Sequence, residues 1–223
     1  MKAVIFDMDG VLINTESHHM VIEHQIFRDL GLEITEEERE PFIGYAADEM
    51  WSRVIAHYKL DHSPNDLLNL NNERIIEYFT SQADIEMIPG VNRVLQWIED
   101  RGIPLAVASS SSRIVMDVLL EQAGLDKYFK IRVGGQDVEK SKPAPFIYLH
   151  TAGLLEVEPG ECVVIEDSTN GIRAAKSAGM YCIGYKGVGF HGQDQSMADE
   201  TIAEYDELIP LLTPLFSVGK SPM

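Results

Sequence analysis

Short apolar runs alternate with helical patterns over residues 91–184, and this alternation constrains the fold more than any other feature. Strand-like runs at 103–108, 131–133, 162–165 and 181–184 are separated by segments whose apolar residues recur every three or four positions. Strands that alternate with helices form right-handed βαβ units around a parallel sheet. The sequence therefore predicts an α/β protein with a Rossmann-like parallel sheet and helices on both faces.

A further apolar run, Ala3 to Phe6, leads directly into Asp7, Met8, Asp9 and Gly10. Such a run suits a strand buried on both faces of a parallel sheet, whose carboxyl end is where open α/β sheets bind ligands. Residues two apart project to one side of an extended chain, so Asp7 and Asp9 can face one site. Taken alone, the stretch fits a hairpin equally well, because Asp-Gly between apolar runs is also a hairpin signal.

Residues 15–85 carry helical patterns with no strand between them. Thr15-Glu16-Ser17 is the expected N-terminal cap of the first helix and Gly31 its stop signal, and further apolar stripes at helical spacing follow. Because this segment interrupts the alternating pattern, we expect four helices inserted into the α/β domain. The predicted domains are a core of residues 1–14 and 86–223 and a helical domain of residues 15–85.

Charge and cysteine content narrow the class of protein. The formal net charge of −18 argues against a nucleic-acid surface, which needs clustered Lys and Arg. No run approaches the ~18 consecutive apolar residues of a membrane span, and no secretory signal is visible. Cys162 and Cys182 fall in predicted buried strands without metal-ligand spacing, which favours reduced thiols and a cytoplasmic location. We find no oligomerisation signal and expect a monomer.

Serine and lysine side chains mark two further strand ends. Ser109 to Ser112 stand at the start of a helix, where hydroxyls and free backbone N–H groups suit a phosphate. One of Ser111 and Ser112 is expected only to cap the helix. Lys142 precedes Pro143-Ala144-Pro145, and the prolines fix the chain that carries it. We expect Lys142 to clamp a phosphate; the alternative is a solvated surface lysine.

Two adjacent acids, Glu166 and Asp167, follow the strand at 162–165. Acids at the end of a buried strand need a partner, and a hard divalent cation such as Mg²⁺ is the simplest. The carboxyl ends of parallel strands meet at one edge of a sheet, so all four strand ends converge there. The hairpin alternative explains none of the other three. We therefore favour a strand that ends before Asp7 and a turn at Asp9-Gly10 that leads out to the helices.

These segments together resemble the four motifs of the haloacid dehalogenase (HAD) superfamily. The matching stretches occur in the family's order: Phe6 to Val11, Ser109, Lys142 to Pro145, and Glu166 to Ala175 with Ala178-Gly179. The inserted helices resemble the C1-type cap of the β-phosphoglucomutase-like branch. The resemblance implies phosphoryl transfer, with Asp7 as the nucleophile that forms an aspartyl-phosphate and Asp9 as general acid and base.

The resemblance also implies how the ligands are bound. Mg²⁺ would be held by four residues: the Asp7 side chain, the Asp9 backbone carbonyl, Glu166 and Asp167. Ser109, the adjacent Ser110 and Lys142 would neutralise the transferring phosphoryl group of a small-molecule phosphate ester.

The cap departs from the β-phosphoglucomutase pattern at two positions. Gly44 matches the glycine of its specificity loop, but Ala47 replaces the mutase arginine and Ile43 the mutase lysine. His19 falls where that mutase has a histidine near the hinge; the alternative is a solvated helix histidine. We therefore expect a Mg²⁺-dependent phosphatase of a small phosphorylated metabolite such as a sugar phosphate. The alternatives are β-phosphoglucomutase and a catalytically silent binding or regulatory protein.

Overall fold

The computed structural model describes residues 1–39, 47–81, 85–187 and 192–216. Its strands form one sheet of order β3-β2-β1-β4-β5-β6. The strands are β1 (Ala3–Phe6), β2 (Leu105–Ala108), β3 (Ile131–Val133), β4 (Cys162–Glu166), β5 (Tyr181–Tyr185) and β6 (Glu200–Ile202). All neighbouring strands are parallel, which confirms the predicted sheet.

The central strand, β1, lies between β2 and β4 and is paired in parallel with both. Val4 is opposite Leu105 on one side and Val163 on the other, so the partners of β1 come from far along the chain. The hairpin interpretation of this stretch is therefore wrong. All four β1 residues are buried, as expected for a strand covered on both faces.

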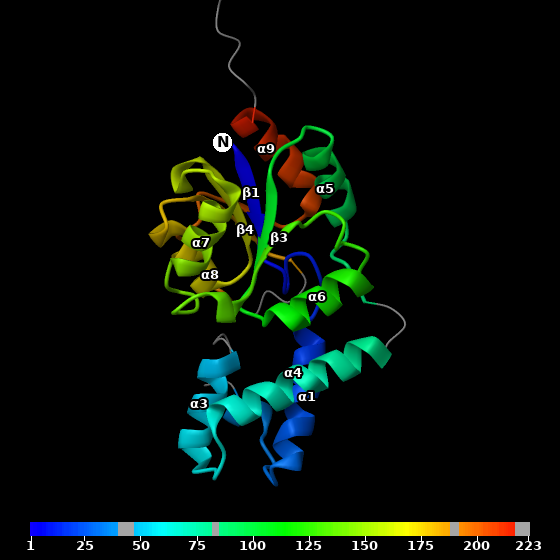
Figure 1. Cartoon of the computed structure of the whole chain (residues 1–223), viewed down its shortest axis with the longest axis vertical. Coiled ribbons are helices and arrows are strands. Elements are labelled where there is room, and N and C mark those ends of the chain that lie inside the picture. The colour runs from blue at the N-terminus through cyan, green and yellow to red at the C-terminus, as the bar shows by residue number, and fades with distance from the viewer. Residues whose placement is uncertain (40–46, 82–84, 188–191, 217–223) are drawn as a thin grey trace, which may run out of the picture.

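Different helices cover the two faces of the sheet (Figure 1). Val4 and Phe6 belong to an apolar cluster that includes residues of the core helices α5 (Val91–Glu99), α6 (Arg113–Gln122) and α9 (Leu208–Phe216) and extends into the helices after β1. Ala3 and Ile5 project to the other face, because side chains alternate along a strand. That face is covered by α7 (Phe146–Leu155) and α8 (Thr169–Ser177), and Cys162 and Cys182 are free, buried thiols there.

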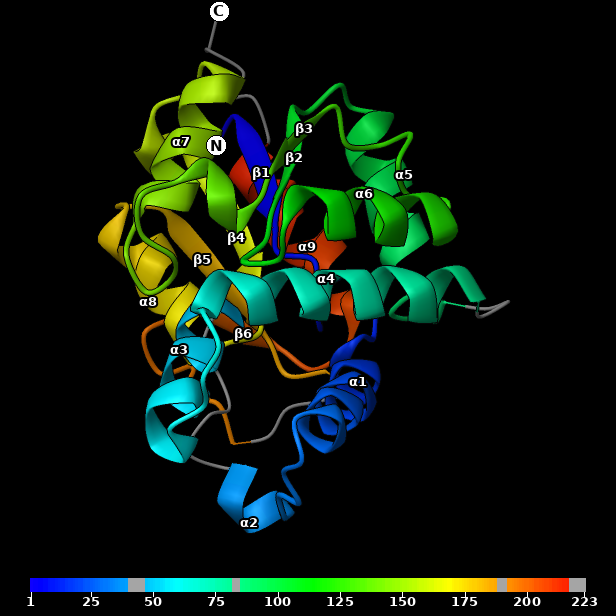
Figure 2. The ribbon, with the colours of Figure 1, turned by 60° about the horizontal axis from the view of Figure 1, so that its bottom comes forward.

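The remaining described helices form a separate layer beyond the carboxyl ends of the strands (Figures 1 and 2). They are α1 (Glu16–Asp29), α2 (Glu36–Arg39), α3 (Ala47–Tyr58) and α4 (Pro64–Ser81). The long helix α4 packs against α1 and α3 within the layer and against α6 of the core. Gly44 and Ile43 lie outside the described residues, and the domain boundary at residue 85 stays a prediction.

Three short 3₁₀ helices complete the described elements: η2 (Gly135–Asp137), η3 (Pro159–Glu161) and η4 (Tyr205–Glu207). None of the described helices is both long enough and apolar enough to span a bilayer.

A tight turn connects β1 to the helical layer. Gly10 has φ +74°, in the left-handed region that favours glycine, and the Leu12 N–H donates to the Met8 carbonyl at 2.8 Å. The hydroxyl of Tyr205, in η4, donates to the Val11 carbonyl and ties the turn to the C-terminal part of the chain. The predicted turn out of β1 is confirmed. The hydrogen bonds of the turn hold the backbone at Asp7 and Asp9 in one position.

Candidate active site

A cavity of about 510 Å³ lies between the carboxyl edge of the sheet and the helical layer. On the core side it is lined by Asp7, Asp9, Ser109, Lys142 and Asp167, so all four predicted strand ends contribute to it. The strand order 3-2-1-4-5-6 places β1 and β4 side by side at the centre of the sheet. The strand order reverses between these two strands, and open α/β sheets bind ligands in the crevice outside the carboxyl ends of the strands at such a reversal.

The ammonium of Lys142 is buried at the centre of this edge. Its Nζ donates to Asp7 Oδ1 and Glu166 Oε1, both at 2.6 Å, and to the Ala108 carbonyl at 3.2 Å. An ammonium has three protons, and each has a partner here. Burial acts to lower the pKa of Lys142, but Asp7 and Glu166 raise it above its ordinary value. The lysine is therefore held charged, and the solvated alternative is wrong.

Both oxygens of Glu166 are occupied by hydrogen bonds. Oε1 accepts from Lys142 and from the Tyr148 hydroxyl at 2.9 Å. Oε2 accepts from the backbone N–H groups of Asp167 and Ser168 and from the Ser168 hydroxyl. Burial acts to raise the pKa of Glu166, but Lys142 and these donors lower it. The contact of Tyr148 with Glu166 is not predicted from the sequence, because an aromatic residue in an apolar helix normally indicates packing.

Three carboxylates converge beside the lysine: ligand oxygens of Asp7, Glu166 and Asp167 lie within 4.8 Å of one another. Burial raises the pKa of Asp7 to about 8, with Glu166 and Asp9 adding to the effect and Lys142 opposing it. Burial and the same kind of neighbours raise the pKa of Asp167 well above its usual range. The single positive charge of Lys142 therefore does not neutralise the three carboxylates. The donor set fits a hard divalent cation, which would favour both charged forms.

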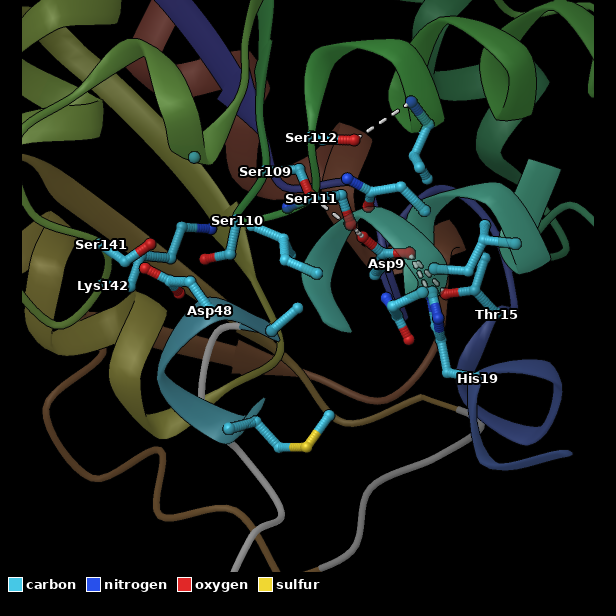
Figure 3. Close-up of a pocket in the computed structure, with 18 of the residues that line it drawn as sticks. Asp9, Thr15, His19, Asp48, Ser109, Ser110, Ser111, Ser112, Ser141 and Lys142 are labelled. Carbon is cyan, nitrogen blue, oxygen red and sulfur yellow. Dashed lines mark hydrogen bonds and ion pairs between the residues drawn. The ribbon is translucent and has the colours of Figure 1, made fainter. Parts of the chain in front are cut away.

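Asp9 has a different environment, in which donors surround its carboxylate (Figure 3). Oδ1 accepts from the Thr15 hydroxyl at 2.7 Å and lies 3.2 Å from His19 Nε2. Oδ2 accepts from the Ser109 hydroxyl at 3.0 Å and the Ser111 hydroxyl at 2.8 Å. Burial acts to raise the pKa of Asp9, but His19, Thr15 and Ser111 lower it strongly. The Asp9 side chain is therefore ionised and turned toward the start of α1.

Two of these partners correct expectations from the sequence. Thr15 occupies the N-cap position of α1, but its side chain makes no capping hydrogen bond and serves Asp9 instead. The His19 side chain is only 25% exposed and contacts Asp9, so the solvated interpretation of this histidine is wrong. Both residue types are common at helix starts, and the pattern alone does not reveal the contact.

The serine run divides its tasks. Ser112 is the cap of α6 and accepts from the Val115 N–H at 3.4 Å, as expected for one of the four. The Ser109 N–H donates to the Val133 carbonyl at 3.1 Å, which anchors the run to β3. Ser109 and Ser110 line the cavity beside Asp9 and Lys142. Their role as phosphate ligands stays a prediction.

The sequence matches the haloacid dehalogenase-like hydrolases over residues 4–185. With the parallel sheet, the strand-end residues and the helical cap, this match makes the chain a member of the haloacid dehalogenase-like hydrolase family and a phosphohydrolase by class. Within the family it belongs to the β-phosphoglucomutase-like branch, and α1 to α4 are a C1-type cap.

Relatives resemble the chain over most of its length. It is 32% identical over 215 residues to the β-phosphoglucomutase of Bacillus subtilis, covering 93% of this chain and 92% of the relative. It is 33% identical over 180 residues to the phosphorylated carbohydrates phosphatase of Thermotoga maritima, covering 81% and 82%. The crystal structure of CbbY from Rhodobacter sphaeroides in complex with phosphate superimposes with a TM-score of 0.86 at 29% identity, covering 93% and 96%.

A longer relative is the protein SUPPRESSOR OF QUENCHING 1 of Arabidopsis thaliana. It is 36% identical over 191 residues, which are 83% of this chain and 18% of that protein.

Proposed function

We propose that the chain is a Mg²⁺-dependent phosphatase that cleaves a small sugar phosphate through an aspartyl-phosphate on Asp7. The observation that carries the proposal is the position of Asp7. It follows the central strand, lies 2.6 Å from Lys142 and lines the cavity beneath the cap. We also propose residues 15–85 as the cap domain.

Asp7 is suited to be the nucleophile because it lines the cavity and its Oδ1 is fixed by Lys142, while a bound cation would favour the ionised form that burial opposes. Oδ1 is the oxygen bound by the lysine, so Oδ2 is the one that would attack phosphorus and form the acyl phosphate. Lys142 neither donates nor accepts a proton in the reaction, since its neighbours keep it charged. Its charge offsets that of the incoming phosphoryl group. The Ser109 hydroxyl and the backbone around Ser110 would bind the phosphoryl oxygens.

Asp9 would protonate the leaving oxygen and then take a proton from the attacking water. In its present position it is a poor acid, because four donors surround it, and three of them, His19, Thr15 and Ser111, lower its pKa. Protonation therefore requires that Asp9 exchange some of these donors for the substrate. Since Thr15 and His19 stand at the start of the cap, movement of the cap would couple to this exchange.

The acidic cluster supports a Mg²⁺ site in which only some of the carboxylates bind the cation directly. The oxygens of Glu166 are taken by Lys142, Tyr148 and the chain around Ser168. We therefore assign direct binding to Asp7 and Asp167, together with the Asp9 backbone carbonyl, and a supporting role to Glu166. When bound, the cation supplies charge neutralisation to the transferring phosphoryl group.

The substrate class is supported by the size of the cavity and by the relatives. A volume of about 510 Å³ suits a small metabolite. The named activities of the Thermotoga and Bacillus relatives both concern phosphorylated carbohydrates.

The test is a panel of phosphate monoesters assayed for released phosphate with Mg²⁺ and with a chelator. We expect Mg²⁺-dependent turnover of at least one sugar phosphate. The Asp7→Asn variant should lose turnover entirely while it keeps its circular dichroism spectrum and cooperative melting. Substantial residual turnover in that variant would refute the mechanism. Absence of turnover across the panel would instead favour the silent binding protein, which the charged strand-end residues and the family membership disfavour.

β-Phosphoglucomutase activity is the second candidate, favoured by the match to the Bacillus enzyme over almost the whole chain. Ala47 counts against it, because this methyl group lines the cavity where that branch places an arginine for a second phosphate. Incubation with β-glucose 1-phosphate and a trace of the 1,6-bisphosphate separates the two activities. Formation of glucose 6-phosphate without released phosphate would overturn the phosphatase assignment.

A further inference from the structure

The cap wall of the cavity contains an ion pair that no sequence pattern predicts. Glu23 in α1 and Arg39 in α2 are cap residues, and both line the cavity. Arg39 donates from Nε and Nη2 to the same oxygen, Glu23 Oε2, at 2.9 and 2.6 Å. The two side chains are only 13% and 18% exposed. A charge-assisted pair this shielded is held more firmly than a surface ion pair.

The pair sets the charge of the wall that faces the leaving group. Among the described cap residues that line the cavity, Arg39 is the one side chain with a fixed positive charge, and Glu23 and Asp48 are acidic. Glu23 neutralises the guanidinium, so among the described cap residues of the cavity no Lys or Arg is left to offset the charge of Asp48. Apart from His19, which contacts Asp9, the other polar side chains among these described residues are uncharged, and they include Asn65 and Asn72. Such a wall can hydrogen-bond hydroxyl groups, but it repels a second phosphate.

We propose that Glu23 is a specificity-determining residue that restricts the enzyme to monophosphate esters with an uncharged, hydroxylated leaving group. It does so by holding Arg39 in a neutral pair, so that no Lys or Arg among the described cap residues of the cavity is available to a distal phosphate. The guanidinium already lies in the wall and is a good bidentate partner for phosphate. Removal of the competing carboxylate should therefore convert the wall from one that rejects a second phosphate to one that binds it. This inference rests on the proposed phosphatase function and deepens it.

The test compares sugar monophosphates with the matching bisphosphates, for example fructose 1-phosphate with fructose 1,6-bisphosphate and glucose 6-phosphate with glucose 1,6-bisphosphate. Glu23→Gln keeps the shape and hydrogen-bonding capacity of the side chain but removes its charge. We expect the ratio of kcat/KM for bisphosphate over monophosphate to rise about tenfold in this variant, the change that about 1.4 kcal/mol produces. The double variant Glu23→Gln, Arg39→Gln should lose that gain, because it lacks the guanidinium.

A matched control uses the ion pair between Asp29 of α1 and Arg74 of α4. This pair, at 3.0 Å, joins cap helices through exposed side chains that do not line the cavity. Asp29→Asn removes one carboxylate from the cap, as Glu23→Gln does, and should leave the ratio unchanged. Where Glu23→Gln fails to give a cooperative melt, Glu23→Ala takes its place in the same comparison.

A second readout avoids turnover altogether. Binding of each bisphosphate to Asp7→Asn with Mg²⁺, measured by calorimetry, should tighten about tenfold when Glu23→Gln is added, and binding of the monophosphate should not. An unchanged ratio in both readouts, or a wild-type enzyme that prefers bisphosphates, would overturn the inference. Either result leaves the phosphatase function standing. If the wild type releases phosphate from no ester in the panel, it is the proposed function that fails.

Discussion

At the scale of single residues, two aspartates in one short stretch have opposite electrostatic environments. Asp7 is buried among carboxylates, and burial raises its pKa to about 8. Asp9 is also shielded, but His19, Thr15 and Ser111 lower its pKa strongly. Pairs of acids whose pKa values are pushed apart by their surroundings are typical of sites that divide two chemical tasks. The difference arises from neighbours that converge in space, not from the two residues themselves.

The raised pKa of Asp7 makes the stability of the cation-free protein depend on pH. The native state holds a proton on Asp7 up to about pH 8, whereas the unfolded chain loses it near its ordinary value of 3.8. The free energy of unfolding should therefore fall as the pH rises from about 4 to about 8, by at most about 1.4 kcal/mol per pH unit for one group.

We predict that Asp7→Asn gains stability relative to the wild type over that range, by at least about 1 kcal/mol between pH 5 and pH 8. Urea unfolding in the presence of a chelator measures the difference, and saturating Mg²⁺ should shrink it by favouring the ionised form. A difference between the two proteins that does not change with pH would contradict the proposed origin of the shift.

At the scale of elements, the turn between β1 and α1 is built around one close approach. A Cβ on Gly10 would overlap the Asp167 carboxylate, and the φ of +74° already disfavours any other residue. Gly31, after α1, has a nearly identical φ of +73° but open space around it. The two glycines therefore separate backbone strain from packing against the acidic cluster.

We predict that Gly31→Ala costs only the strain of a left-handed alanine, about 1–2 kcal/mol. Gly10→Ala should cost more than this and should also weaken Mg²⁺ binding, because Asp167 must move. Melting curves with increasing Mg²⁺ measure both effects. Equal losses in the two variants, with the Mg²⁺ response intact, would show that the contact between Gly10 and Asp167 has no role in cation binding.

The strands and the strand-end residues could be predicted because their signals are local. A buried strand is a short apolar run, and whatever follows it lies at the sheet edge, which is how Asp7, Lys142 and Asp167 were identified. The contacts of Asp9 with Thr15 and His19 could not be predicted in this way. They form because the turn after β1 brings the start of α1 back beside Asp9. The pairing of Glu23 with Arg39 likewise depends on how α2 packs on α1. Contacts between elements are set by packing geometry, which periodicity does not encode.

At the scale of the whole molecule, a strongly acidic protein is proposed to bind an anionic substrate. The net charge of the protein is −18, whereas the positive charge of the buried Lys142 acts only within the site. Charges far apart on the surface are screened by salt, but buried pairs are screened much less. Added salt should therefore weaken the general repulsion of a phosphate ester more than it weakens the attraction at the site.

We predict that kcat/KM for a phosphate monoester rises about two- to threefold as KCl is increased from roughly 0.01 M to 0.1 M, over which the Debye length falls from about 30 to about 10 Å. The rise should lie in kcat/KM rather than kcat, since repulsion acts on encounter. Steady-state kinetics at constant free Mg²⁺ measure it. A steady fall with salt would mean that exposed cations near the entrance dominate.

The hydrogen bond from Tyr205 to the Val11 carbonyl spans 194 positions of the chain. During synthesis β1 emerges before its neighbours β2 and β4 and before Tyr205, so this tie forms much later than the strand. At about 5–20 residues per second, the ribosome needs roughly 10–40 s to make the intervening chain. A nascent chain therefore carries the two proposed catalytic aspartates for at least this time before the tie that holds their turn can form, and the proposed phosphoryl chemistry has to wait for it.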